Sequence, residues 1–257
     1  MITSLNINDD SITGRLGNKL FIIAAMVGYT LRHTDSFILP KWQYADVFPN
    51  IHTTDYPIDV NCRYQEPHFH YYEIPYHKNY NMSLHGYFQS EKYFAHCREA
   101  TKYYLSPNDS IKKLVDEKWK VIQKAVNTDK TVLVQVRAGL DYDNDYHGIL
   151  PMRYFEEAFK QFPDHTFIMF SDDIEKCKHD FKRNDIYFVD NTNPIVDMFL
   201  SAKCNNAIIP NSSFSWWSAW FIDNEDKKVI APKAWFGPRG GALNDTKDLY
   251  MEDWLIL

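Results

Sequence analysis

The residues best suited to chemistry stand directly after short apolar runs in the second half of the chain. Arg137 follows TVLVQV, Asp172 and Asp173 follow TFIMFS, and a cluster of amides and hydroxyls follows NAIIP. Each apolar run is predicted to be a buried strand. Because ligands bind at the carboxyl ends of strands in open parallel sheets, these groups together indicate one binding edge.

The chemistry of these groups points to an anion site with neighbouring hydrogen-bond acceptors. Arg137 can pair with a phosphate through two donors. The cluster after NAIIP opens a predicted helix, whose first N–H groups can hold an anion; its members are Asn211, Ser212, Ser213, Phe214 and Ser215. Asp172 and Asp173 repel phosphate but can accept hydrogen bonds from a nucleobase or a ribose. Helix capping is the alternative role for the serines and for Asp173.

A fourth polar segment, GRLGN, lies between a predicted strand and a predicted buried helix near the N-terminus. Gly14 and Gly17 allow a tight turn and a close approach of the backbone. The segment lacks the third glycine of a dinucleotide fingerprint and the Lys-Ser/Thr pair of a P-loop. On its own it therefore specifies no ligand.

The arrangement of elements predicts an α/β protein. The first half contains the strand ITSLNIN, the helix KLFIIAAMVGYTLRH, the strand SFILP, short elements over residues 41–90, and the helices SEKYFAHCREATKYYL and 109–126. Strands then alternate with helices from TVLVQV to KVIAP, which is typical of βαβ units in a mostly parallel sheet. We place the domain boundary near residue 127, between domains 1–126 and 127–257.

Composition excludes several classes of protein. The chain has 257 residues, 45% hydrophobic and 24% charged, as expected for a packed core. A net charge of −6 argues against a broad nucleic-acid-binding face. The four cysteines are scattered without a CxxC pair, so a zinc ribbon is not expected. The histidines of the HFHYY stretch, with His77, have no clear carboxylate partners, so we predict no metal site. Without a signal peptide or a membrane-spanning apolar run, a cytoplasmic location is expected.

Several segments together resemble one known family, the inverting α-1,2-fucosyltransferases that use GDP-fucose. The similar segments are GRLGNKLFIIA, LHGYFQSEKYF, FIMFSDDIEKCK and, most specific of all, DMFLSAKCNNAIIPNSSFSWWSAWF. They occur in the family's order and extend over most of the chain.

The resemblance implies a GT-B-like fold, with two Rossmann-like domains facing a cleft. Residues 1–126 would form the acceptor side, and residues 127–257 would hold the nucleotide sugar. The implied partners are a nucleotide-sugar donor and a glycan acceptor, with no metal or other cofactor. Protein donors would then stabilise the leaving diphosphate, and Arg137 falls on the family arginine that does so.

The arginine motif departs from the usual family form. Gln135 replaces a histidine, Ala138 replaces a second arginine, and one residue is inserted before Asp141. The spacing is instead similar to that of protein O-fucosyltransferases, and Arg137 is retained in both alignments. The departure leaves the nucleotide base and the sugar of the donor open.

The implied mechanism is transfer of L-fucose from GDP-fucose with inversion, α-1,2 to galactose by resemblance. Arg137 and Asp141 are the predicted catalytic residues, and the remaining donor-binding residues are Arg15, Gly17, Asn18 and Gln135. The base that deprotonates the acceptor stays open among Asp10, His85, Glu91 and Asp141. Two alternatives are a donor with another nucleotide deoxysugar and a catalytically silent glycan-binding protein. The acceptor and the oligomeric state are also left open.

Overall fold

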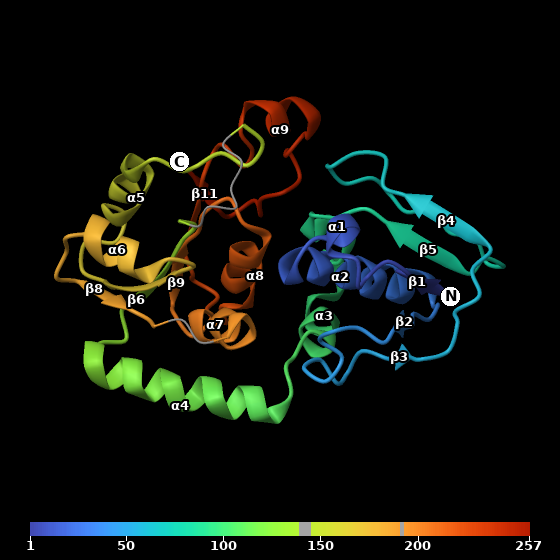
Figure 1. The fold of residues 1–257 in the computed structure, drawn as a ribbon, viewed down its shortest axis with the longest axis horizontal. Coiled ribbons are helices and arrows are strands. Elements are labelled where there is room, and N and C mark those ends of the chain that lie inside the picture. The colour runs from blue at the N-terminus through green and yellow to red at the C-terminus, as the bar shows by residue number, and fades with distance from the viewer. Residues whose placement is uncertain (139–144, 191–192) are drawn as a thin grey trace. The chain divides into compact units, whose positions relative to one another are not determined.

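The computed structural model describes residues 1–138, 145–190 and 193–257, which form two compact units (Figure 1). The first unit contains Met1–Asn108 and Asn244–Met251, and the second contains Asp109–Leu243 and Glu252–Leu257. All strand pairs among the described residues are parallel, and helices separate the strands. The expected α/β class is confirmed.

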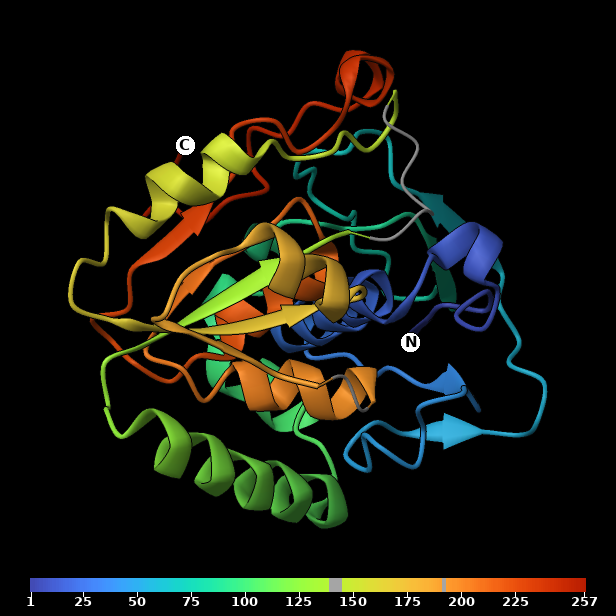
Figure 2. The same cartoon turned by 60° about the vertical axis from the view of Figure 1, so that its left-hand side comes forward.

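The division between the units differs from the boundary expected near residue 127. Helix α4 (Asp109–Val126) packs against α7 (Pro194–Ser201), and the two helices lie side by side in both views (Figures 1 and 2). Val115 and Ile122, one heptad apart on α4, are buried. A helix belongs to the unit that covers its apolar stripe, and for α4 that is the second unit.

The second unit is built on a six-stranded parallel sheet in the order β11-β10-β9-β6-β7-β8. Its strands are β6 (Thr131–Val136), β7 (Thr166–Ser171), β8 (Ile186–Phe188), β9 (Asn206–Ile208), β10 (Val229–Ala231) and β11 (Leu255–Ile256). The first strand of this sheet along the chain is β6, and β7 and β8 are added in turn on one side of it. The chain then crosses to the other side of β6, where β9, β10 and β11 follow in order. Strand β6 therefore has β7 on one side and β9 on the other.

Helices cover both faces of this sheet (Figure 1). Aromatic side chains of α5 (Met152–Phe159) and Cys177 of α6 (Ile174–Asp180) share one core with Val132, Val134 and Met169 of the sheet. Helices α7 and α8 (Ser213–Phe221) pack on each other, and in Figure 1 they lie on the side of the sheet away from α5 and α6. A short helix, α9 (Pro238–Leu243), follows β10.

Helix α8 is anchored by its tryptophans. Trp216, Trp217 and Trp220 are completely buried. Their rings pack edge to face, with centroids 5.1 Å apart in the Trp216–Trp217 and Trp217–Trp220 pairs. Trp254, near the C-terminus, packs against Trp216 at 5.5 Å. The tryptophans therefore hold α8 against the core of the second unit.

The first unit has a three-stranded parallel sheet and a two-stranded one. The larger has the order β1-β5-β4, and the smaller pairs β2 with β3. The strands are β1 (Ile2–Thr3), β2 (Leu39–Pro40), β3 (Thr53–Thr54), β4 (Cys62–Gln65) and β5 (Met82–His85). The long helix α2 (Leu16–His33) follows the short α1 (Asp10–Thr13) and is buried along most of its length, as its apolar sequence predicts.

The segment expected to form one helix after residue 89 is broken into three. It contains the 3-10 helices η1 (Glu91–Tyr93) and η2 (Ala95–Cys97), followed by α3 (Arg98–Tyr104). Phe94, between the first two, has φ −136° and ψ 6°. The Tyr93 carbonyl packs so closely on Gly28 of α2 that a Cβ at Gly28 would overlap it. Close packing against α2 therefore overrides the local helical pattern.

Residues near the C-terminus return to the first unit. Asp248 accepts a hydrogen bond from the Tyr71 backbone at 3.1 Å and forms an ion pair with Lys92 at 2.6 Å. None of the described helices is both long and apolar enough to cross a membrane.

Lys227 should stabilise the second unit by capping the end of α8. Its Nζ donates to the carbonyls of Ala219, Trp220 and Ile222 at 2.9, 3.1 and 2.9 Å. Replacing Lys227 with Met removes both these bonds and the favourable charge at the helix C-terminus. We expect the free energy of unfolding to fall by about 1–2 kcal/mol in urea denaturation.

Lys233→Met is the matched control, because Lys233 is an exposed lysine of the same unit. Equal denaturation midpoints for the two variants would show that the Lys227 contacts contribute nothing to stability.

Candidate functional site

Three strand ends meet at one edge of the second unit. In the sheet register, Gln135 and Val136 of β6 pair with Phe170 and Ser171 of β7. On the other side, Val134 pairs with Ile208 of β9. The residues that follow these strands are Arg137, Asp172 and the Asn211–Ser215 segment, so the structure brings these three parts of the chain to one edge.

Arg137 and Asp172 form an ion pair at this edge. Arg137 Nε lies 3.1 Å from Asp172 Oδ2, and the Arg137 side chain is 18% exposed. Asp172 Oδ1 also accepts a hydrogen bond of 2.7 Å from the backbone N–H of Ala138. Asp172 therefore fixes both the backbone after β6 and one side of the guanidinium. This contact orients Arg137, and it is a role for Asp172 other than the expected contact with the donor.

Gln135 lies beneath this edge. It is 5% exposed, and its Nε2 donates to Ser218 Oγ of α8 at 3.2 Å. Ser218 Oγ in turn donates to the Phe214 carbonyl in the first turn of α8, at 3.2 Å. Gln135 Oε1 accepts no hydrogen bond from the residues that the structure describes. The residue that replaces the family histidine thus connects β6 with α8.

Helix capping and ligand binding were the two alternatives for the polar strand ends, and the structure shows capping at one strand end but not at another. Asp173 caps α6, since its side chain accepts from Lys176 N at 3.0 Å. Ser212 occupies the corresponding position before α8, but within the described chain its side chain makes no capping hydrogen bond. The first turn of α8, with Ser213, Phe214 and Ser215, therefore starts without the side-chain cap that the capping alternative requires.

Asn211 is a buried scaffold residue behind this turn. It is 4% exposed. Its Nδ2 donates to the carbonyls of His147, Gly148 and Trp235, the last two at 3.1 and 3.0 Å. One amide thus joins the 147–148 loop to the segment before α9. Asp141, the second predicted catalytic residue, lies outside the described residues.

Arg15, Gly17 and Asn18 belong to the first unit, where they form the start of α2. Arg15 is exposed at the N-cap position, Gly17 is buried, and Asn18 is half-buried. Asn18 Oδ1 accepts a hydrogen bond of 2.9 Å from Gln89 Nε2. Gly14 has φ +69°, and a Cβ at this position would overlap the Asn18 side-chain nitrogen. The first glycine of GRLGN is therefore required by the conformation and by the Asn18 side chain.

A buried lysine that sequence reasoning missed supports the same loop. Lys19 has no exposed surface, and its Nζ contacts the Ile7 carbonyl, Thr13 Oγ1 at 3.2 Å and Asp10 Oδ1 at 2.8 Å. These contacts satisfy a charge that would otherwise be costly to bury. One signal was available in the sequence, because Lys19 stands directly before the apolar run LFIIAAMV of the predicted buried helix.

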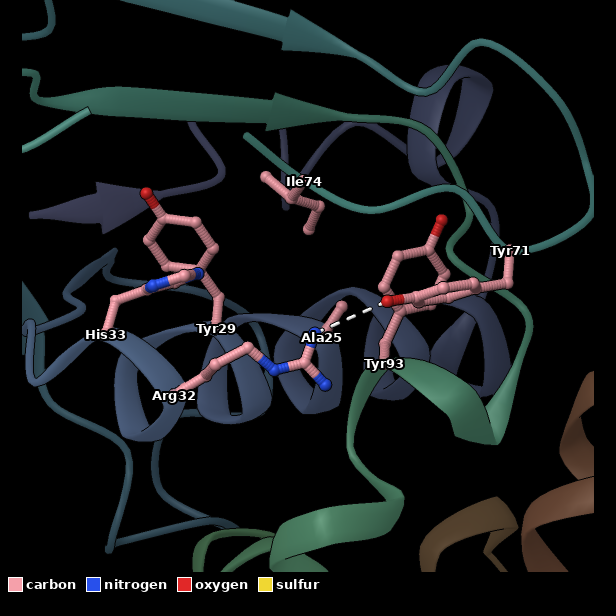
Figure 3. Close-up of a pocket in the computed structure, with 7 residues that line it drawn as sticks. All are labelled: Ala25, Tyr29, Arg32, His33, Tyr71, Ile74 and Tyr93. Carbon is pink, nitrogen blue, oxygen red and sulfur yellow. Dashed lines mark hydrogen bonds between the residues drawn. The ribbon is translucent and has the colours of Figure 1, made fainter. Parts of the chain in front are cut away.

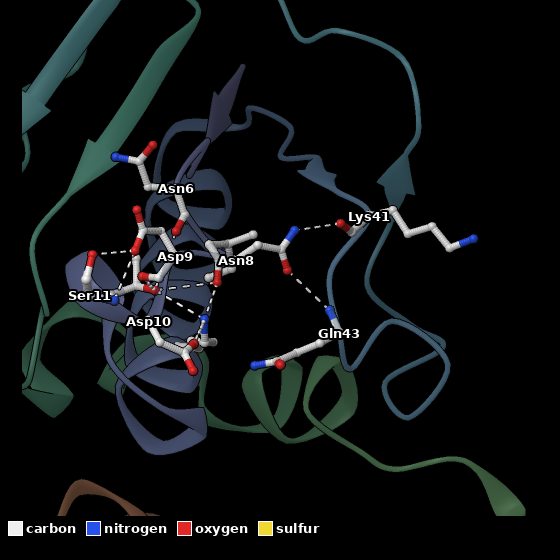
Figure 4. Close-up of polar contacts among 10 residues, drawn as sticks. Asn6, Asn8, Asp9, Asp10, Ser11, Lys41 and Gln43 are labelled. Atoms are coloured by element: carbon white, nitrogen blue, oxygen red, sulfur yellow. Dashed lines mark hydrogen bonds and ion pairs between the residues drawn. The ribbon is translucent and has the colours of Figure 1, made fainter.

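The loop between β1 and α2 is also tied by its own polar side chains (Figure 4). Asp9 Oδ1 accepts from Ser11 N at 3.0 Å and so caps α1. Asn8 donates to the Lys41 carbonyl at 2.8 Å and accepts from Gln43 N at 3.2 Å. The described residues contain no group of His, Cys, Asp and Glu side chains suited to hold a metal ion.

The described candidates for the general base are all engaged in contacts. Asp10 pairs with Lys19 at 2.8 Å, and Glu91 pairs with Arg98 at 2.7 Å. Burial, with a smaller effect of Arg63, lowers the pKa of His85. Its two ring nitrogens lie 3.3 Å from Asn6 Nδ2 and 3.4 Å from Ser83 Oγ. The geometry therefore selects none of these three as the base.

A small aromatic hollow lies farther along α2 (Figure 3). Its lining residues are Ala25, Tyr29, Arg32, His33, Tyr71, Ile74 and Tyr93. Arg32 donates to the Tyr71 hydroxyl at 3.3 Å. The helical residues of the hollow come from the second half of α2, whereas Asn18 is in its first turn, so the hollow is separate from the GRLGN loop.

Glu66 is a second ionisable group that sequence reasoning missed, and it is partly buried. It follows β4, and its carboxylate accepts hydrogen bonds from the backbone N–H groups of Tyr87 at 2.7 Å and Phe88 at 3.0 Å. The Tyr93 hydroxyl lies 3.4 Å from Oε1. These bonds favour the charged carboxylate, but burial outweighs them and raises the pKa of Glu66 from 4.5 to about 7.

The raised pKa of Glu66 predicts a pH-dependent stability. In the unfolded chain Glu66 ionises at its ordinary pKa of 4.5, whereas in the folded protein it keeps its proton up to about pH 7. Its contribution is therefore fully present below pH 4.5 and is lost as the pH rises to 7. We expect the free energy of unfolding of wild type, relative to Glu66→Gln, to fall by about 2–3 kcal/mol over this range.

Denaturant titrations at a series of pH values measure this difference. Glu73→Gln is the control, because Glu73 is an exposed carboxylate of the same unit. A constant difference between wild type and Glu66→Gln from pH 4.5 to 7.5 would contradict the assignment.

The geometry defines an α/β protein with an arginine and a helix start at one sheet edge. The model of glycosyl transferase family 11 matches residues 12–257, and the chain belongs to that family.

Two curated relatives come from Escherichia coli. The O-antigen biosynthesis glycosyltransferase WbnK is 37% identical over 151 residues, which cover 54% of this chain and 47% of that protein. An alpha-1,2-colitosyltransferase is 32% identical over 165 residues, which cover 59% of this chain and 55% of that protein. The chain thus matches about half the length of each relative.

Solved structures with the same fold include two fucosyltransferases. NodZ from Bradyrhizobium has a TM-score of 0.52 and 12% identity, covering 84% of this chain and 91% of that chain. It was also solved after soaking with GDP-fucose. The apo form of POFUT1 has a TM-score of 0.52 and 12% identity, covering 90% and 97%. Both are GT-B fucosyltransferases, which confirms the expected GT-B-like fold class.

Proposed function

We propose that this protein transfers L-fucose from GDP-fucose to a hydroxyl of a glycan acceptor, with inversion and without a metal ion. An α-1,2 linkage to galactose is the proposed product. The observation that carries the proposal is the edge of the second unit, where Arg137 follows β6 next to the strand that leads into α8. Family membership and the fucosyltransferase fold support it.

The proposed mechanism places positive potential where negative charge develops. As the sugar leaves, charge accumulates on the departing diphosphate. Arg137 is a permanent cation, and the first-turn N–H groups of α8 carry the positive end of the helix dipole. Asp172 holds Arg137 in place before the reaction, so little reorganisation is needed when the charge forms. Such preorganised donors are a large source of rate enhancement in group transfer.

A second candidate donor is a different nucleotide deoxysugar. The relative described as an alpha-1,2-colitosyltransferase supports this alternative, as do the Gln135 and Ala138 departures. A diphosphate site would bind either donor, because both donors contain the diphosphate and differ in other parts of the molecule. Turnover measured with each nucleotide sugar separates the candidates.

Nucleotide binding is the first test of the proposal. Isothermal titration with GDP in the presence of EDTA should give a binding isotherm similar to that with Mg²⁺, since protein groups are proposed to hold the diphosphate. UDP and dTDP should bind more weakly. A strict requirement for Mg²⁺, or tighter binding of UDP, would contradict the GDP proposal. Failure to bind any of the three would favour a silent glycan-binding homologue.

Replacement of Arg137 is the sharpest test of the mechanism. Arg137→Ala should reduce the transfer rate by about 10²–10³-fold, corresponding to about 2.7–4 kcal/mol for one preorganised donor. Arg137→Lys should be intermediate, because it keeps the charge and loses the planar geometry. Asp172 is partly exposed, so leaving it without Arg137 should cost little stability.

Melting temperature and transfer rate are measured on the same samples. A folded Arg137→Ala protein with near-normal transfer would remove this residue from the mechanism. A protein that is unfolded would instead show that the pair with Asp172 is structural.

A further inference from the structure

The turn after β5 has an unusual backbone conformation. Gly86 has φ +145°, and Phe88, which is not a glycine, has φ +51°. A bulky residue in the left-handed region is unfavourable and persists only where its surroundings impose the conformation. Such residues concentrate at functional sites, so the cause and the consequence of this turn are informative.

Glu66 is the group that imposes the turn. Its carboxylate accepts the two successive N–H groups of Tyr87 and Phe88. A Cβ at Gly86 would overlap the Glu66 side chain, so the chain approaches the carboxylate as closely as glycine allows. The titratable side chains that face Glu66 are tyrosines, namely Tyr64 on β4, the strand that Glu66 follows, and Tyr93 from η1.

The consequence of the turn is the placement of Gln89. Gln89 follows Phe88 directly and is 6% exposed. Its Nε2 donates to Asn18 Oδ1 at 2.9 Å. With Oδ1 held by Gln89, the Asn18 nitrogen lies against Gly14, in the space that a Cβ there would occupy. One chain of contacts therefore runs from Glu66 through the turn and Gln89 to Asn18 and the GRLGN loop.

We infer that Glu66 and Gln89 are positioning residues, which fix the orientation of the Asn18 amide for the sugar-transfer reaction. The inference rests on the proposed function, because it assumes that the GRLGN loop acts on a substrate. Glu66 sets the backbone of the turn, and Gln89 transmits that geometry to Asn18. Neither is assigned a contact with substrate.

A double-mutant cycle between Gln89 and Asn18 tests this relay. Gln89→Met keeps the length of the side chain and removes its hydrogen bond. We expect kcat/KM to fall by about 10–100-fold, the range for a misplaced catalytic group. In an Asn18→Ala background the same change should have less than about a threefold effect. The control is Gln65→Met, an exposed glutamine on β4, for which wild-type kcat/KM is expected.

The Glu66 end of the relay has a conservative variant. Glu66→Gln keeps an oxygen acceptor for the turn and cannot ionise. We expect kcat/KM of this variant to lie within about threefold of wild type. We also expect its kcat/KM to vary less with pH between pH 5 and 8 than that of wild type. Glu66→Ala removes the acceptor and should resemble Gln89→Met. Equal losses in the Gln and Ala variants, with an unchanged pH profile, would overturn the positioning role of Glu66.

Thermal unfolding of the four cycle proteins separates failure of the relay from failure of the proposed function. Additive effects of Gln89→Met and Asn18→Ala on both kcat/KM and unfolding would overturn the relay in an active protein. A wild-type protein that transfers sugar from no GDP, UDP or dTDP donor would overturn the proposed function. In that case the unfolding data of the four proteins test the relay. Additive effects of the two substitutions on unfolding would overturn it, and non-additive effects would support it.

Discussion

Parallel pairing on both sides of β6 is the constraint on which the candidate donor site depends. β7 and β9 are bonded to the same strand in the same direction, so the segments that follow all three strands emerge at one edge. Arg137, Asp172 and the start of α8 come from stretches far apart in the sequence. Their contacts also cross between these elements, through the Arg137–Asp172 pair and the Gln135–Ser218 hydrogen bond.

The two ends of α8 differ in how their backbone groups are satisfied. The positive end of the helix dipole lies at the sheet edge. At the C-terminal end, Lys227 satisfies the last carbonyls. At the other end, Ser212 stands in the capping position without a capping bond in the described chain. Three buried tryptophans hold the helix in place. A helix start arranged in this way is suited to receive an anionic ligand.

In the first unit, buried polar groups organise the loops. Loop backbones carry N–H and carbonyl groups that must find partners when they are covered. Lys19 supplies donors to the β1–α2 loop, and Glu66 supplies acceptors to the turn after β5. Both groups are costly to bury in their charged forms, and each has specific polar partners. The polar interior of this unit therefore determines the geometry of its loops, while α2 supplies the apolar core.

The sequence by itself determined the order of strands and helices in the second unit, the strand ends that carry Arg137 and Asp172, and the family. These features are encoded locally, in the alternation of apolar runs with helical patterns and in contiguous motifs. The same patterns predicted the buried helix α2. Asp141 and the donor-binding roles stay predictions, because no contact in the described chain tests them.

Only the tertiary structure determined which other parts of the chain these elements and polar side chains contact. Helix α4 joined the second unit because α7 covers its apolar stripe, and residues 244–251 joined the first through Asp248. The helix expected after residue 89 broke where Tyr93 meets Gly28. Asp173 became a cap, Asn211 a scaffold and Glu66 the support of a strained turn. Some of these outcomes depend on contacts between residues that are distant in sequence. Others depend on which of several similar polar groups a side chain binds. Local sequence patterns encode neither.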